Sequence, residues 1–261
     1  MTTQRWKITI EYDGRPFSGW QRQEEGVPSV QQAIEDALRG FCQQDITIFV
    51  AGRTDAGVHG KGQVAHFDLD YGDRELTAFN LAKALNAHLR GVPVSILKAE
   101  AVADDFHARF SATNKLYIYR VICRSAPLTF DRGRAWQIWK NLDVEAMRAG
   151  AVHLLGHHDF TTFRDSDCQA KSPMKTLDRL DIQTHDYDDM GTEEISFHVE
   201  GRSFLHHQVR NMVGTLALVG EGKWQPDDIK TALLACDRTK GGPTAPADGL
   251  YLVRVDYLAR S

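Results

Sequence analysis

A run of nine residues, AGRTDAGVH at positions 51–59, holds the residue types in this sequence best suited to chemistry. Within the run, Asp55 follows Arg53 by two positions and lies between two glycines, which let a backbone approach a ligand closely. In an extended chain the side chains alternate, so Arg53 and Asp55 would share one face and Thr54 would take the other. A nearby guanidinium keeps a carboxylate ionised, as a nucleophile or general base must be.

The same Arg-x-Asp pattern also occurs in ordinary turns, where the two side chains form a surface ion pair of little energetic value. A three-residue Arg-x-Asp pattern more often forms a surface ion pair in a turn, but the complete nine-residue run is longer than a turn requires. A glycosidase-type hydrolase would need a second acid at a paired distance. Asp13 lies at the expected end of a strand, beside a turn glycine, and is a weak candidate for this second acid. Asp55 is therefore the first candidate for a single catalytic carboxylate.

The histidines and cysteines do not predict a metal site. Adjacent histidines occur at 157–158 and 206–207, but neither pair has the spacing of a zinc motif, and neighbours on a helix would point apart. His59 lies close to Asp55 and is expected to contact a substrate phosphate. The four cysteines are scattered without a Cys-x-x-Cys pair, which predicts neither a disulfide framework nor a zinc site.

Composition is that of a soluble globular protein, with 261 residues, 42% of them hydrophobic and 25% charged. No apolar stretch is long enough to span a bilayer, and no signal peptide is recognisable. Reduced, scattered cysteines favour a cytoplasmic location. The net charge of −4 counts mildly against a nucleic-acid partner, although phosphates are contacted by local patches.

Hydrophobic periodicity predicts thirteen elements in two similar series. In the first half, strands are expected at 7–12, 46–50, 63–69 and 94–102, and helices at 29–41 and 76–89. Ser29 and Gln32 form the pattern of a capping box at the start of the first helix. In the second half, strands are expected at 116–122, 177–184, 195–199 and 250–257, and helices at 144–155, 205–219 and 227–235. Loops are expected at 130–140 and 238–248.

Apart from an extra helix at 227–235 in the second half, both series have the order strand, helix, strand, strand, helix, strand. The expected fold class is therefore α+β, with two ferredoxin-like βαββαβ halves that have antiparallel sheets. The expected domains are residues 1–106, which carry the Asp55 segment, and residues 107–261.

Five blocks of residues, in order along the chain, resemble the tRNA pseudouridine synthase A family. The blocks are Glu11–Gly14 with Gly19–Gln23, the run at 51–59, Asp105–Ala112 followed by Lys115, Tyr117 and Tyr119, then Gly156–Arg164 with Ser203–Gly214, and finally Gly249–Val253. The resemblance implies conversion of uridine to pseudouridine in the anticodon stem-loop of tRNA, by a homodimer without metal or organic cofactor. It also implies that the antiparallel sheets of the two halves are joined around a central RNA-binding cleft. Phosphate contacts are expected from the basic residues that border the blocks, which are Arg22, Arg53, Lys61, Arg109, Lys115, Arg164, Arg202 and Arg210.

Five site residues follow from the resemblance. Asp55 would be the catalytic carboxylate and Arg53 would help to displace the target base. Tyr117 would stack on the flipped uracil, Arg210 would pair with Asp55, and Leu252 would line the pocket. By pattern alone, Tyr117 could equally be a core aromatic of a strand, and Arg210 an ordinary surface arginine at the flank of an apolar helix.

Two other functions remain open. One is the same isomerisation on other uridines or other RNAs. The other is a non-catalytic RNA-binding protein or chaperone that uses the same cleft. A pure binder has no use for a carboxylate facing phosphate, so the Arg53–Asp55 pair favours the enzyme.

Overall fold

The computed structural model describes residues 3–72 and 75–258, which form two compact units. The first unit contains the described residues up to Thr113 and those from Leu252 onward, and the second contains Asn114–Tyr251. The unit boundaries fall inside two strands, β5 (Ala112–Cys123) and β11 (Leu250–Tyr257). The division into domains 1–106 and 107–261 stays a prediction.

The first unit has the connectivity of a ferredoxin-like fold. Its sheet has the strand order β4-β1-β3, β2 pairs with β3, and the pairings of β1 with β3, β1 with β4 and β2 with β3 are antiparallel. The final residues of β11 follow β3 in the same sheet. The other elements are β1 (Thr3–Tyr12), α1 (Val30–Cys42), β2 (Phe49–Val50), β3 (His59–Asp70), α2 (Ala78–His88) and β4 (Val94–Val102).

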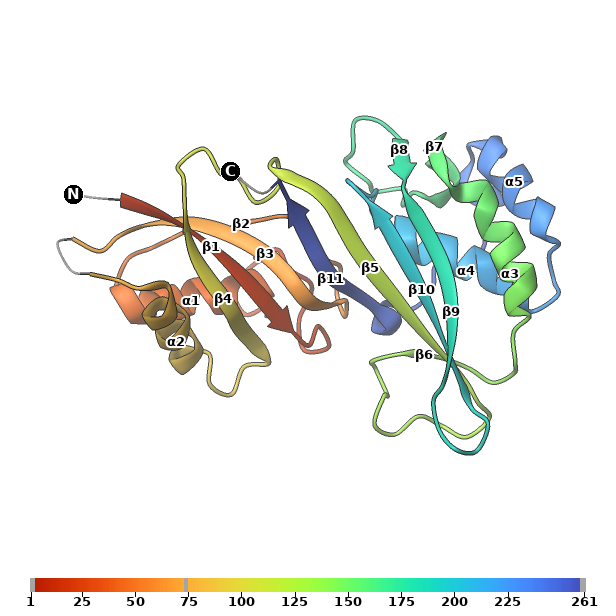
Figure 1. Ribbon diagram of the computed structural model, residues 1–261, viewed down its shortest axis with the longest axis horizontal. Coiled ribbons are helices and arrows are strands. Elements are labelled where there is room, and N and C mark those ends of the chain that lie inside the picture. The colour runs from red at the N-terminus through yellow and green to blue at the C-terminus, as the bar shows by residue number, and fades with distance from the viewer. Residues whose placement is uncertain (1–2, 73–74, 259–261) are drawn as a thin grey trace. The chain divides into compact units, whose positions relative to one another are not determined.

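Period-two alternation in β1 separates the two faces of this sheet. Trp6, Ile8 and Ile10 are buried in one core with the apolar stripes of α1 and α2, which pack on that face (Figure 1). Burying such side chains contributes about 1.5–3 kcal/mol each. Half of the predicted capping box is present, because the Ser29 side chain accepts a hydrogen bond from the backbone N–H of Gln32. The Gln32 side chain instead bonds with Arg22 and Asp36.

In the second unit, β5, β10 and β9 pair antiparallel in that order, and α3, α4 and α5 pack together (Figure 1). The predicted α+β class is confirmed. The other elements are β6 (Trp136–Ile138), α3 (Val144–Ala151), β7 (Gly156–Asp159), β8 (Met174–Leu177), β9 (Arg179–Asp186), β10 (Glu193–Gly201), α4 (Gln208–Gly220), α5 (Pro226–Ala235) and the 3-10 helices Val152–Leu154, Thr161–Phe163, Arg238–Lys240 and Ala247–Gly249. Across the described part of the chain, no helix is long and apolar enough to cross a membrane.

The expectation of a loop over residues 130–140 was wrong in part, because β6 lies within it. This strand pairs parallel to β5 through Val121–Cys123. The Gln137 side chain ties β6 to the preceding segment, donating to the carbonyls of Arg124 and Ala126. A strand of three residues is too short to show alternating hydrophobicity in the sequence. Its extended conformation depends on pairing with β5.

Two histidines fix the turn at residues 107–111 of the first unit, one from β3 and one from within the turn. His66 accepts the Ala108 N–H at Nδ1 (3.2 Å), and His107 Nδ1 accepts those of Arg109 (3.1 Å) and Phe110 (3.4 Å). A ring nitrogen that accepts a hydrogen bond carries no proton, so this geometry requires both imidazoles to be neutral. Burial is the main cause that lowers the pKa of His66 to about 4.

Acidification should therefore destabilise the first unit. The ordinary pKa of histidine is 6.5, so between pH 6.5 and about 4 the unfolded chain binds a proton at His66 that the folded chain excludes. The free energy of unfolding then falls as the pH drops through this window. His66→Gln should flatten this part of a plot of Tm against pH, measured by circular dichroism from pH 4 to 8. Equal slopes in wild type and variant would contradict the assignment.

Candidate active site

The Asp55 loop, defined as Ala51–Val58, joins β2 to β3 in the first unit. Its middle is tied to the segment before α1, because the Trp20 N–H donates to the Thr54 carbonyl (3.0 Å). Its end forms a tight turn in which the Val58 N–H donates to the Asp55 carbonyl (3.1 Å). Hydrogen bonds on both sides of the carboxylate restrict the loop to one path.

Side chains in the Asp55 loop alternate as predicted. Thr54 is buried, with 8% of its surface exposed, whereas Arg53 is exposed and Asp55 is half-buried. The Thr54 hydroxyl forms a buried hydrogen bond of 2.8 Å with the Tyr12 hydroxyl of β1. Thr54 thus anchors the loop from within the first unit, while the neighbouring Arg53 stays exposed and Asp55 half-buried.

A second buried polar group supports the loop from β3. Gln63 is fully buried, and its side-chain amide donates to the Gly52 carbonyl (2.8 Å). Burial, with a smaller contribution from the negative charge of Asp55, raises the pKa of Tyr12 to about 12, and hydrogen bonds with Thr54 and Gln63 oppose this rise. Tyr12 is therefore protonated at neutral pH and serves as a hydrogen-bonding support, not as a base.

Loss of the Tyr12–Thr54 hydrogen bond should lower the stability of the first unit. Tyr12→Phe leaves the buried Thr54 hydroxyl without this partner and should lower the free energy of unfolding by about 1–2 kcal/mol. Thr54→Val should cost a similar amount, and the double variant little more, which gives a coupling of about 1 kcal/mol. Urea unfolding of the four proteins measures the cycle. Strictly additive losses would show that the two hydroxyls do not act together.

The turn at Asp13–Gly14 packs directly against the end of the Asp55 loop. His59, only 2% exposed, accepts the Gly14 N–H at Nδ1 (3.2 Å), and the same nitrogen lies 3.4 Å from Asp13 Oδ1. A Cβ atom added at Gly14 would lie 2.1 Å from the Val58 carbonyl oxygen. His59 thus has a clear structural role, and its phosphate contact stays a prediction.

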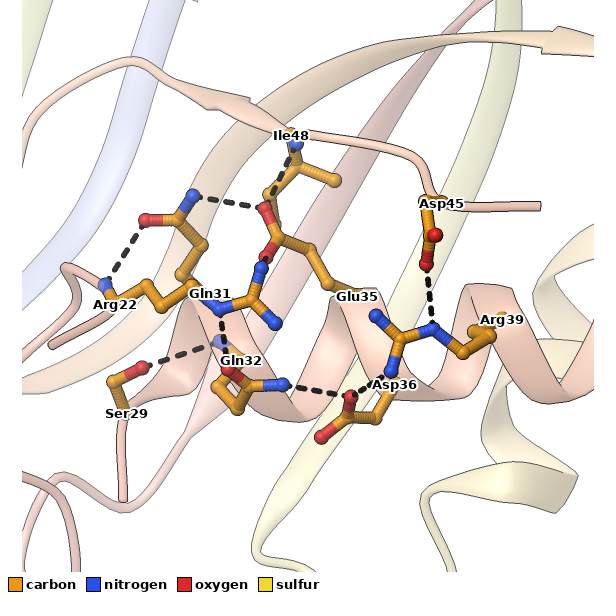
Figure 2. A network of polar contacts seen from close by, with 9 residues as sticks. All are labelled: Arg22, Ser29, Gln31, Gln32, Glu35, Asp36, Arg39, Asp45 and Ile48. Atoms are coloured by element: carbon orange, nitrogen blue, oxygen red, sulfur yellow. Dashed lines mark hydrogen bonds and ion pairs between the residues drawn. The ribbon is translucent and has the colours of Figure 1, made fainter. Parts of the chain in front are cut away.

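A buried carboxylate on α1 joins the segment before α1 to the chain that leads into the Asp55 loop (Figure 2). Glu35 is 3% exposed and accepts hydrogen bonds from the Gln31 side chain (2.8 Å) and the Ile48 N–H (3.2 Å). Its other oxygen pairs with the Arg22 guanidinium at 3.1 Å. Glu35 therefore holds the strand that enters the loop and orients Arg22, one of the expected phosphate contacts.

Three further predicted site residues, Tyr117, Arg210 and Leu252, lie on strands or a helix. In the second unit, Tyr117 of β5 is 8% exposed and makes an edge-to-face contact with Phe204, with 5.2 Å between ring centres. Arg210 of α4 is half-buried, and its Nε donates to the Ala245 carbonyl (2.7 Å). Leu252 of β11 is fully buried and belongs to the first unit, as do Arg53, Asp55 and His59.

Comparison with known proteins identifies the family. The sequence profile described as tRNA pseudouridine synthase matches residues 8–111 and 151–258. A protein of Paramagnetospirillum magneticum named tRNA pseudouridine synthase A is 57% identical over 255 residues, 98% of this chain and 96% of that protein. One of the same name from Rhodospirillum centenum is 54% identical over 254 residues, 97% of this chain and 100% of that protein. The chain belongs to the tRNA pseudouridine synthase family.

The synthase is accordingly an isomerase. Its Asp55 loop lies within the first matched range, and Arg210 and Leu252 lie within the second. Tyr117 falls between the two ranges, although the relatives named above align with nearly the whole chain.

The expectation that adjacent histidines point apart was wrong for His206 and His207 of the synthase. Their ring centres are 4.0 Å apart, and His207 Nδ1 lies 2.6 Å from an Asp165 carboxylate oxygen. The cause is local: His207 is the cap residue before α4, with a left-handed φ of 61°, so the pair precedes the helix. Burial opposes ionisation of Asp165, but hydrogen bonds from the Asp167 N–H and His207 hold its pKa below the usual range.

The residues that support the Asp55 loop were not found by sequence reasoning. Tyr12 and Gln63 read as ordinary members of alternating strands, and nothing local marks them as partners of the Asp55 loop. Glu35 did carry a signal, because it directly follows Ile34 on the apolar side of α1, where a charge is unusual. A buried charge requires a partner, which Arg22 provides here.

Proposed function

We propose that this synthase converts uridine to pseudouridine in the anticodon stem-loop of tRNA, at positions 38–40, with Asp55 as the catalytic carboxylate. One observation carries the proposal: the Asp55 loop is anchored from inside through the buried Thr54, while Arg53 is exposed and Asp55 is half-buried. A loop held in this way presents a carboxylate and a guanidinium in a defined arrangement, which catalysis requires.

The reaction needs a single ionised carboxylate close to the sugar. The bond between N1 and C1′ breaks, the uracil turns, a bond forms between C5 and C1′, and the hydrogen on C5 is replaced by one on N1, so that atoms balance without a co-reactant. The carboxylate can attack C1′, attack C6 or remove a proton from C2′, and each route requires it to be ionised. No redox step occurs and no water is activated, so we expect neither metal nor organic cofactor.

The other site residues take the parts that the resemblance implies. Extruding the target base costs a few kcal/mol, so the enzyme must displace and receive it. Arg53 helps to displace the base, Tyr117 stacks on the extruded uracil and Leu252 lines the pocket. Arg210 pairs with the catalytic carboxylate, a role for which arginine is better suited than lysine.

Partners and location follow from the same proposal. The substrate is tRNA, and His59 contacts one of its phosphates. The synthase acts as a homodimer in the cytoplasm. Sedimentation of the purified protein tests the dimer directly, since a monomer at micromolar concentration would contradict it.

The function is tested with an unmodified tRNA transcript. The purified protein is incubated with it in EDTA without added cofactor, and pseudouridine is mapped by chemical modification and primer extension. Pseudouridine at positions 38–40 is expected. Its formation only at other uridines would mean the same chemistry on a different site. Tight binding without any conversion would favour the RNA-binding protein or chaperone.

A further inference from the structure

Four aromatic and imidazole rings form a contiguous ring cluster on the first unit. We define it as Phe49, His66, His107 and Phe110. Phe49 stacks on His66 with ring centres 5.2 Å apart, His66 lies 4.6 Å from His107, and His107 lies 4.3 Å from Phe110. The ring contacts of the cluster thus link β2, β3 and the turn at 107–111.

The two inner rings fix the position of the outer ones. The hydrogen bonds accepted by His66 and His107 hold the backbone of the turn, and the Ser111 N–H donates to the His107 carbonyl (2.9 Å). Neutral imidazoles add no charge that would hinder stacking. Phe110 is consequently held rigidly although its own side chain is largely outside the core.

The outer rings are displayed to solvent. Phe49 is 50% exposed and Phe110 is 70% exposed. The exposed Arg109 guanidinium lies 5.7 Å from the centre of the Phe110 ring. Ordering a turn to present a phenylalanine and an arginine side by side costs conformational entropy and buries little apolar surface. The arrangement suits a ligand with a flat apolar face next to a negative charge, which describes a nucleotide.

We propose that the ring cluster is a stacking platform for an unpaired nucleobase of the RNA substrate, with Arg109 on an adjacent phosphate. The proposal rests on the proposed function for the presence of RNA. Phe49 precedes the Asp55 loop by two residues, but the platform extends away from it, because His66 is seven residues along β3 from His59, roughly 20 Å in an extended strand. Every base has a π-face, so such a platform adds affinity without reading the sequence.

A second copy of the chain fits the ring cluster less well. Two partly exposed phenylalanine rings offer roughly 200 Å² of apolar surface. A stable protein–protein interface buries about 800 Å² on each partner. The ring cluster is large enough for one or two bases and too small to support a dimer by itself.

The test is the affinity of the full chain for an unmodified tRNA transcript, measured by fluorescence anisotropy at several salt concentrations. Phe110→Ala should bind about 5- to 150-fold more weakly, the loss that a stacked base implies, with an unchanged salt dependence. Arg109→Gln should reduce the slope of log affinity against log salt by about one, because one phosphate contact is lost. Phe110→Trp should retain the affinity.

Phe79→Ala is the matched control, because Phe79 is 74% exposed in the same unit but lies outside the ring cluster. It should bind tRNA as the wild type does. Wild-type affinity in Phe110→Ala would overturn the platform, as would a loss accompanied by dissociation of a dimer in sedimentation. Pseudouridine formation is assayed separately: if the wild type forms none while Phe110→Ala still loses tRNA affinity, the platform stands and the proposed function fails.

Discussion

Replacing Asp55 by asparagine should abolish pseudouridine formation while leaving tRNA binding largely intact. The amide keeps the size of the side chain but has no ionised oxygen, and every route to the isomerisation requires one. We expect the rate to fall by a factor of about 10⁴ or more, as for other enzymes that lose a catalytic carboxylate or nucleophile. Single-turnover conversion of a tRNA transcript measures the rate, and anisotropy measures the binding.

Asp36→Asn is the control for this substitution. Asp36 is an exposed acid of α1 in the same unit, where it accepts a hydrogen bond from Gln32. This variant should form pseudouridine at the wild-type rate. Full activity in Asp55→Asn would remove the proposed mechanism. A parallel loss of tRNA affinity in Asp55→Asn would instead show that the carboxylate chiefly organises the bound RNA.

Gly14→Ala should have the second largest effect, on catalysis as well as stability. The new Cβ would lie 2.1 Å from the Val58 carbonyl oxygen and 2.5 Å from its carbon, so one backbone segment has to move. Overpacking of this kind costs about 1–3 kcal/mol. Val58 ends the Asp55 loop, and a displacement of about 1 Å at a catalytic group can slow a reaction about a hundredfold. Chemical unfolding and single-turnover kinetics measure the two losses.

Gly26→Ala separates this clash from ordinary backbone strain. Gly26 has a positive φ of 87° and nothing within 4 Å of an added Cβ. It should lose about 1–2 kcal/mol of stability from the left-handed conformation and retain full catalytic rate. If Gly14→Ala were equally active, the Asp13–Gly14 turn would not position the Asp55 loop.

Much of the fold could be predicted from periodicity because its elements alternate between core and solvent. The 7–12 pattern lies within β1, and the capped start of α1 was correct. The helix expected from residue 205 begins at Gln208, since His207 adopts a left-handed φ that no propensity indicates. The short strand β6 escaped prediction because its partner strand, not its own sequence, makes it extended.

The chemical part of the candidate site could also be proposed from sequence. Arg53 and Asp55 stand in one short run, and the alternation that turns Thr54 inward needs only an extended backbone. The supports of that run come from distant positions, such as Tyr12 and Glu35, which local pattern cannot connect to it.

The sequence by itself determined the family, the α+β class and the carboxylate proposed for catalysis. All three reside in the order of side chains along short segments, where alternation and spacing are set by backbone geometry. Only the tertiary structure decided that Tyr12, Gln63 and Glu35 support the Asp55 loop and that Phe49 and Phe110 share one ring cluster. Buried hydrogen bonds and ring contacts join residues far apart in the chain, so they exist only once the fold has brought those residues together.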